Sequence, residues 1–135
     1  MIKIAIPSYK RPRMGTMKLL TEFSPSDIYI FVNDDEEREN YVKENPSVNV
    51  IATGTKGITP ARNFILNFFP DSEHIMMLDD DIESFCVMKI VQLKKILFEI
   101  TNLKEFLEQG FDACEKVGAK LWGVQMCALG MFMTR

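Results

Sequence analysis

Four short apolar runs occupy the first part of the chain, and each is followed by polar residues. They are residues 2–6, 28–32, 48–52 and 75–78, reading IKIAI, IYIFV, VNVIA and IMML. Most are nearly continuous in apolar residues, rich in Ile and Val, and too short for buried helices. This pattern is typical of strands covered on both faces, so it predicts a parallel sheet.

The segments between these runs are long enough for the crossover connections that parallel strands need. The first has an apolar stretch before Ser24 and Pro25, and the second, DDEERENYVKEN, is polar and predicts a short surface helix. The third predicts a helix over residues 60–69, with Thr59 as its N-cap and Pro60 in its first turn.

The pattern changes after the fourth run. Residues 89–100, KIVQLKKILFEI, fit a helix or a hairpin, and their β-branched content favours a hairpin centred on Lys94 and Lys95. Asn102 and Glu105 have capping-box spacing, which predicts a helix over residues 103–118. Residues 120–126, KLWGVQM, predict a last strand. The fold class expected is therefore α/β, a Rossmann-like, mostly parallel sheet with crossover helices in a single domain over residues 1–135.

Composition supports a globular protein and narrows its class. The chain has 135 residues, 47% of them hydrophobic, and a net charge of −3, which argues against a generally basic surface for nucleic acid. Three cysteines without a CxxC pair fit neither a disulfide framework nor a zinc knuckle. With no secretory signal and no apolar run near the roughly 18 residues of a membrane span, we expect a cytoplasmic protein without a transmembrane segment.

Ligands of open parallel sheets bind beyond the carboxyl ends of the strands, so the residues after each run are candidates for a site. These residues are Pro7 to Arg11, Asn33 to Asp35, Thr53 to Gly57, and Asp79 to Asp81. All four segments are polar. One edge of the sheet is therefore expected to gather hydroxyls, basic groups and carboxylates.

The triplet Asp79, Asp80 and Asp81 is the sharpest signal. Three successive carboxylates repel one another, and a divalent cation relieves that repulsion. Side chains alternate along an extended segment, so Asp79 and Asp81 are expected to share one side and to hold Mn²⁺ or Mg²⁺. The alternative is an acidic loop that only caps the next segment.

A complementary basic group is expected near the third helix. Arg62 lies at the start of this helix, where the helix dipole is already positive, so an anion such as a phosphate would satisfy both. Lys56, between Gly54 and Gly57, adds a flexible basic loop. Asp34 is a candidate acceptor for a base or a ribose hydroxyl. The alternatives are a surface arginine and a solvated turn.

The order of these motifs resembles the N-terminal, nucleotide-sugar-binding half of glycosyltransferases of the GT-A fold, in the manner of family 2. The matching stretches are IAIPSYKRP, FVNDDEE, GITPARNFIL and HIMMLDDDI, which together span residues 2–82. The chain departs from that family's pattern at FVNDDEE, where Asn33 replaces the first acid of the usual pair.

The resemblance implies a metal-assisted transfer of a sugar from a nucleoside-diphosphate donor to an acceptor hydroxyl. It implies a donor site made of Pro7, Ser8, Tyr9, Arg11, Asp34, Arg62, Asp79 and Asp80, with Asp79 and Asp81 at the Mn²⁺ or Mg²⁺. No residue stands out as the catalytic base. The tail LWGVQMCALGMFM is similar to phage-type relatives linked to DNA base modification. The acceptor is left open, and a modified DNA base and a glycan are two candidates.

Two other functions fit parts of the pattern. An inactive or binding-only remnant of the same fold would keep the motifs without turnover, and a phosphorelay receiver domain would use Asp79 as phosphoacceptor. The acceptor side is expected to be incomplete, because few residues follow the Asp triplet. The apolar run 126–133 would then enter a region supplied by further chain or by a second copy in a homo-oligomer.

Overall fold

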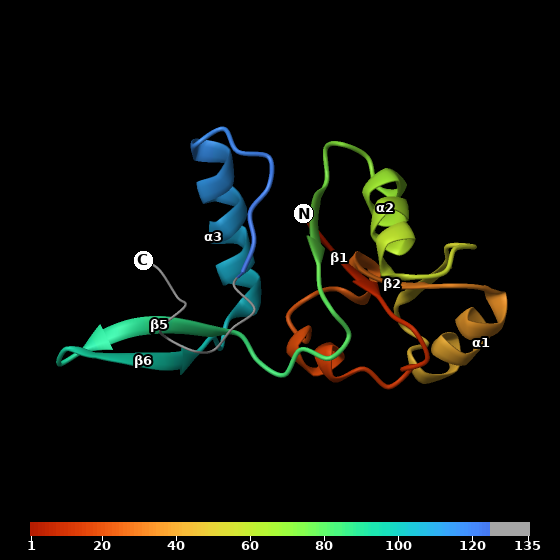
Figure 1. The fold of residues 1–135 in the computed structure, drawn as a ribbon, viewed down its shortest axis with the longest axis horizontal. Helices are drawn as coiled ribbons and strands as arrows, with labels where there is room; N and C mark the ends of the chain where they lie inside the picture. The colour runs from red at the N-terminus through yellow and green to blue at the C-terminus, as the bar shows by residue number, and fades with distance from the viewer. Residues whose placement is uncertain (125–135) are drawn as a thin grey trace. The chain divides into compact units, whose positions relative to one another are not determined.

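The computed structural model describes residues 1–124, which divide into two compact units between Glu83 and Ser84 (Figure 1). The first contains a sheet with its connecting helices, and the second a hairpin and a helix. The single domain over residues 1–135 stays a prediction.

The first unit is built on a four-stranded parallel sheet with strand order β3-β2-β1-β4. Its strands are β1 (Ile2–Pro7), β2 (Ile28–Val32), β3 (Asn49–Ala52) and β4 (His74–Met77). All four apolar runs therefore form strands within a residue or two of the expected bounds. The predicted α/β fold with a parallel, Rossmann-like sheet is confirmed.

The connections differ more from expectation. The first consists of two short 3-10 helices, η1 (Gly15–Leu19) and η2 (Pro25–Asp27), while the second is helix α1 (Asp35–Glu44). Helix α2 (Ile58–Phe68) begins after Gly57, whose φ of 95° turns the chain into the helix. The prediction of Thr59 as N-cap is wrong, because the glycine turns the chain before Thr59 and places it inside the first turn. Pro60 is tolerated there, since first-turn N–H groups have no partner within the helix.

Both faces of the sheet are covered. On one face, Ile65 and Phe69 from α2 and its end pack against Ala5 and Phe31. Strands β2 and β3 lie on one side of β1, and β4 lies on its other side, so the connection from β3 to β4 runs in the opposite direction to the first two. Because crossovers are right-handed, α2 in this connection covers the face opposite η1 and α1, as Figure 1 shows. Residues that alternate with Ala5 and Phe31 must face that opposite side, and Ile4, Ile6 and Ile30 are fully buried there.

Over residues 84–124, the second unit contains an antiparallel hairpin and one helix. Strands β5 (Cys86–Val91) and β6 (Lys94–Glu99) pair from Cys86↔Glu99 to Val91↔Lys94. The predicted hairpin is confirmed, but its turn is Gln92 and Leu93, both with positive φ, and the two lysines begin β6. The expected centre was two residues late because this turn lacks the usual Asn and Gly.

Helix α3 (Leu103–Lys116) begins as its capping residues predict. The Asn102 Oδ1 accepts a hydrogen bond of 3.1 Å from the Glu105 N–H. Leu103, Leu107 and Cys114 are buried on one face of the helix. The last predicted strand is not found in residues 120–124, and its end and the apolar run 126–133 lie outside the described residues. Across residues 1–124, the helices are too short or too polar to cross a bilayer.

Candidate functional site

The acidic segment after β4 is fixed through its backbone by Thr16 of η1. The buried Thr16 hydroxyl donates to the Asp79 carbonyl at 2.6 Å and accepts from the Ile82 N–H at 2.9 Å. The Thr16 N–H adds a 3.4 Å bond to the Asp80 carbonyl. One side chain from the first connection thus holds both ends of the segment that carries the three carboxylates.

Asp80 is the most enclosed of these carboxylates, with a side chain only 12% exposed. Its Oδ2 accepts a 2.6 Å hydrogen bond from the Ser8 hydroxyl, and its Oδ1 lies 3.1 Å from Arg11 Nη1. Both oxygens therefore have partners from the loop after β1. Asp80 ties the ends of two neighbouring strands, β1 and β4, to each other.

Two arginines neutralise the acidic segment. The Nη1 of Arg11 also lies 3.3 Å from the Asp81 Oδ2, and Arg62 Nη2 from α2 lies 3.1 Å from the Asp79 Oδ1. The backbone turns at Asp80 and Asp81, so the alternation expected for an extended segment does not hold there. Asp80 and Asp81 share one guanidinium, and Asp79 pairs with another.

Helix α1 contributes two side chains, one turn apart, that hold the loop after β1. Glu37 accepts from the Lys10 N–H at 3.0 Å and from the Asn33 N–H at 3.4 Å. The Tyr41 hydroxyl accepts from the Arg11 N–H at 2.8 Å and lies 2.7 Å from the Ser8 Oγ. A helix expected only to cover the surface therefore positions the loop that carries Arg11.

Tyr41 is almost completely buried, with 1% of its surface exposed. This burial raises the pKa of its phenol above the ordinary 10.0, and the nearby charges of Glu37 and Asp80 act in the same direction. Hydrogen bonds with Ser8 and the Arg11 N–H oppose the rise only in part. The phenol is therefore protonated at neutral pH and keeps one proton to donate.

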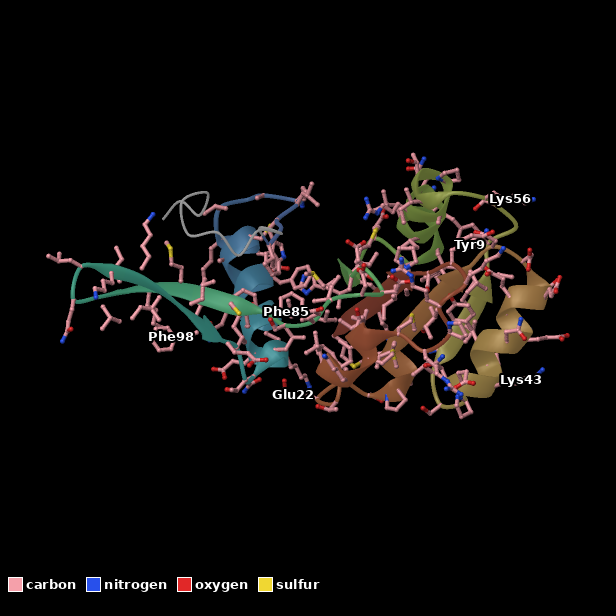
Figure 2. The ribbon with its side chains drawn as sticks, turned by 60° about the horizontal axis from the view of Figure 1, so that its bottom comes forward. Tyr9, Glu22, Lys43, Lys56, Phe85 and Phe98 are labelled. Carbon is pink, nitrogen blue, oxygen red and sulfur yellow. The ribbon has the colours of Figure 1, made fainter. Side chains whose placement is uncertain are left out.

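A cavity of about 640 Å³ lies beside this network, within the size range of small-ligand sites. Its lining includes Tyr9, Lys10, Asn33, Asp34, Tyr41 and Lys56. Figure 2 labels Tyr9, Lys43 and Lys56, which belong to three different parts of this wall. Tyr9 is 55% exposed, so its ring offers a flat apolar surface to a ligand.

Most acids of this cavity have partners inside the fold. The Asp34 Oδ1 caps α1 by accepting from the Glu37 N–H at 2.9 Å. Glu37 holds two backbone N–H groups, and Glu44 pairs with Arg13 at 2.9 Å. Three lysines, Lys10, Lys43 and Lys56, also line the wall. The wall therefore carries four acidic residues and three lysines, and the lysines can pair with a negatively charged group of a ligand.

The structure divides the sequence-predicted residues into two neighbouring groups. Ser8, Arg11, Arg62, Asp79, Asp80 and Asp81 form the arginine and carboxylate cluster. Tyr9 and Asp34 line the cavity, and Pro7 ends β1 opposite Phe31. Tyr41 belongs to both groups, since it lines the cavity and contacts Ser8.

Sequence reasoning missed three residues that hold the site together, Thr16, Glu37 and Tyr41. Asp34 and Glu37 have the spacing of a capping box, which could have placed the start of α1 and the carboxylate of Glu37 near the loop. Tyr41 is the one aromatic residue in a polar helical segment, which marks the buried side of α1. Thr16 carries no comparable signal.

The donor set fits a divalent cation only in part. The acidic segment offers hard carboxylate oxygens, which suit Mg²⁺ or Mn²⁺. Within residues 1–124, no three Asp, Glu, His or Cys residues converge on one point. The segment therefore fits a cation that takes one or two carboxylates from the protein and its other ligands from a diphosphate and water, and it does not fit a closed protein cage.

Comparison with known families identifies the class of protein. The model of the TET-associated glycosyltransferases matches residues 2–135, which is nearly the whole chain. The chain belongs to this family, and the family's description indicates a glycosyltransferase that uses a sugar donor and an acceptor. No curated protein and no solved structure matches the chain. Membership of a glycosyltransferase family argues against the alternative of a phosphorelay receiver domain.

Proposed function

We propose that the first unit binds a nucleoside-diphosphate sugar and that the chain transfers the sugar to an acceptor hydroxyl, as enzymes of the GT-A fold do. The observation that carries the proposal is the meeting of Arg11, Arg62 and the three aspartates at the carboxyl edge of the sheet. These groups come from β1, α2 and β4, and Tyr41 links them to the adjacent cavity. Ligands of open α/β sheets bind at such edges.

The cavity would hold the nucleoside. The exposed ring of Tyr9 offers a stacking surface for a base, and Asp34 faces the same cavity. The lysines of the wall favour the negative charge that a nucleotide brings. The diphosphate would then extend toward Arg11 and Arg62.

The chain's contribution to transfer is positional and electrostatic. The bond between the anomeric carbon and the diphosphate oxygen breaks, a bond to the acceptor oxygen forms, and the acceptor's proton passes to the departing diphosphate or to water. Negative charge grows on the departing diphosphate, and Arg11 and Arg62, which pair with the acidic segment, would stabilise it. Asp79 and Asp81 would hold Mn²⁺ or Mg²⁺ there, and the cation would add to the same charge stabilisation.

Binding can be tested by thermal unfolding with UDP, GDP, ADP and CDP, each with and without Mn²⁺. We expect one nucleotide at saturation to raise the melting temperature by about 5 °C, since a ligand that binds only the folded state stabilises it. Asp81→Asn should remove the Mn²⁺-dependent part of this shift. The matched control is Asp71→Asn, an exposed acid in a turn of the same unit. If none of the four nucleotides shifts the transition, the nucleotide-sugar proposal is wrong.

Transfer can be tested by release of the nucleoside diphosphate from a panel of nucleotide sugars. The acceptors to compare are DNA that carries a hydroxylated base and a soluble glycan. The modified DNA base is the acceptor we propose, because the sequence of the tail resembles phage-type relatives linked to DNA base modification. If release of the nucleoside diphosphate requires the modified DNA, the proposed acceptor is supported. If it requires the glycan instead, the acceptor is a glycan and the DNA proposal is wrong. Binding without release in either arm would identify a binding-only remnant.

A further inference from the structure

A chain of hydrogen bonds runs from the loop after β1 through Tyr41 of α1, returns to the loop and ends on the acidic segment. Its members are the Arg11 N–H, the Tyr41 hydroxyl, the Ser8 hydroxyl and the Asp80 carboxylate. Its distances are 2.8, 2.7 and 2.6 Å in that order. Tyr41 is the only one of the four residues that lies outside the loop after β1 and the acidic segment, and both of its partners, Arg11 and Ser8, belong to that loop.

The direction of every bond in this chain follows from the donors that are present. A backbone N–H can only donate, so the Tyr41 oxygen accepts from Arg11. An ionised carboxylate can only accept, so the Ser8 hydroxyl donates its single hydrogen bond to the Asp80 Oδ2. The Ser8 oxygen must therefore accept the phenol proton of Tyr41. All donors point toward Asp80, and bonds aligned in this way strengthen one another.

The chain fixes the middle carboxylate of the triplet. Asp80 Oδ2 is held by Ser8, Oδ1 by the Arg11 guanidinium, and its carbonyl by the Thr16 N–H. Asp79 and Asp81 each have one oxygen paired with an arginine, and their side chains are 41% and 69% exposed. The carboxylates of Asp79 and Asp81 are therefore accessible to a ligand, whereas that of Asp80 holds the loop after β1 and the acidic segment together.

We propose that Tyr41 is a positioning residue of the donor site, which acts through Ser8 on Asp80 and through the Arg11 N–H on the Arg11 loop. This role rests on the proposed function, because the groups it positions are those assigned to the diphosphate. Without the Tyr41 hydroxyl, Ser8 loses the donor that orients it, and the Arg11 N–H loses its acceptor. Arg11 then no longer holds Asp80 and Asp81 in a single arrangement.

The first test measures the connection in the free protein by amide hydrogen exchange and NMR chemical shifts. In Tyr41→Phe, exchange at the Arg11 amide should rise about tenfold or more, since a protected N–H loses its partner. The amide signals of Asp80 and Asp81 should move as well. The matched control is Tyr29→Phe, which removes a hydroxyl from β2 in the same unit. Unchanged signals at Arg11, Asp80 and Asp81 would overturn the proposal without reference to any nucleotide.

The second test is a double-mutant cycle on nucleotide binding, with the nucleoside diphosphate and Mn²⁺ that give the largest thermal shift. Tyr41→Phe and Ser8→Ala should each weaken binding about tenfold, and the double variant should be no weaker than the weaker single variant. Weakening that multiplies to about a hundredfold means that Tyr41 does not act through Ser8 and contradicts the proposal. Ser8→Thr, which keeps a hydroxyl, should recover part of the binding that Ser8→Ala loses.

The two tests separate the two proposals. If the unchanged protein binds none of the nucleotides, the proposed function fails, and hydrogen exchange still decides whether Tyr41 positions Asp80. If nucleotide binds and Tyr41→Phe binds it as well as Tyr29→Phe does, the donor site stands and the role of Tyr41 in it is refuted.

Discussion

The two units of the chain bury their apolar residues to different extents. In the first unit, the central strands β1 and β2 are almost entirely buried between layers on both faces. In the second, all six residues of β6 are exposed, and Leu93 in the turn is 98% exposed. Every group of the candidate site belongs to the unit with the buried sheet. The comparison indicates that a rigid sheet is what allows loop residues to be held at fixed distances.

The largest expected effect comes from opening the core of the first unit. Phe31 is 1% exposed and contacts four aromatic rings, so Phe31→Ala should lower the free energy of unfolding by about 3–5 kcal/mol. The matched variant in the second unit is Phe98→Ala, where the ring is 41% exposed and the loss should stay below about 1 kcal/mol. Urea unfolding followed by circular dichroism measures both. Equal losses would mean that the two units do not differ in this way.

A smaller effect is expected at an ion pair that joins β1 to η2. Lys3 Nζ lies 2.7 Å from the Asp27 Oδ1, and both side chains are only 15% exposed. Asp27→Asn should therefore cost about 1–2 kcal/mol at pH 7. The control is Asp71→Asn in the same unit, which should leave stability unchanged.

The pH dependence of this pair has a definite sign. The hydrogen bond from Lys3 to Asp27 raises the pKa of Lys3 above its ordinary 10.5. A basic group whose pKa is higher in the folded than in the unfolded protein stabilises the fold. This stabilisation is complete at pH values below the pKa of the unfolded state, and it is lost as the pH rises through the pKa of the folded state. The difference between the unchanged protein and Asp27→Asn should therefore persist from pH 7 to about 9 and shrink above about 10.5. A difference that grows in alkali would contradict this assignment.

The smallest expected effect concerns packing in the second unit. A Cβ built on Gly110 of α3 collides with the ring of Trp122, which itself packs against Phe106 and Phe111. Gly110→Ala gains about 1 kcal/mol of helix propensity but displaces the ring, so we expect a net loss of about 1 kcal/mol. Trp122 is the chain's single tryptophan, so its fluorescence reports the displacement directly. Unchanged fluorescence would show that the ring does not lie against Gly110, and Gln109→Ala serves as the control.

The fold followed from the sequence where hydrophobic patterning decides the structure. The four apolar runs form four strands because a strand that is apolar on both faces must be covered by a layer on each side to be buried from water. Boundaries set by backbone conformation were harder to predict. Gly57 turns the chain into α2 one residue before Ile58, and Gln92 and Leu93 form the hairpin turn without any residue type that marks such a turn.

The candidate site was predictable for residues that directly follow strands. Arg11 and the aspartates were found because the edge of a parallel sheet is a known place for ligands, and Arg62 was found because a basic residue near a helix start favours an anion. Their pairing was not predictable, since it depends on which side chain reaches which across distant segments. Tyr41 and Thr16 were missed for this reason, because their roles rest on contacts with residues 30 or more positions away.

The strand order also sets when the site can assemble. Central strand β1 is synthesised before the other three described strands of the sheet, yet its neighbour β4 is synthesised after them. Ser8 and Asp80, which meet at the ends of these two strands, are 72 residues apart. The nascent chain therefore cannot form the arginine and carboxylate cluster before the Asp triplet has left the ribosome. Until then, one edge of β1 stays unpaired, and the closing of this long loop is the step expected to limit the folding rate of the first unit.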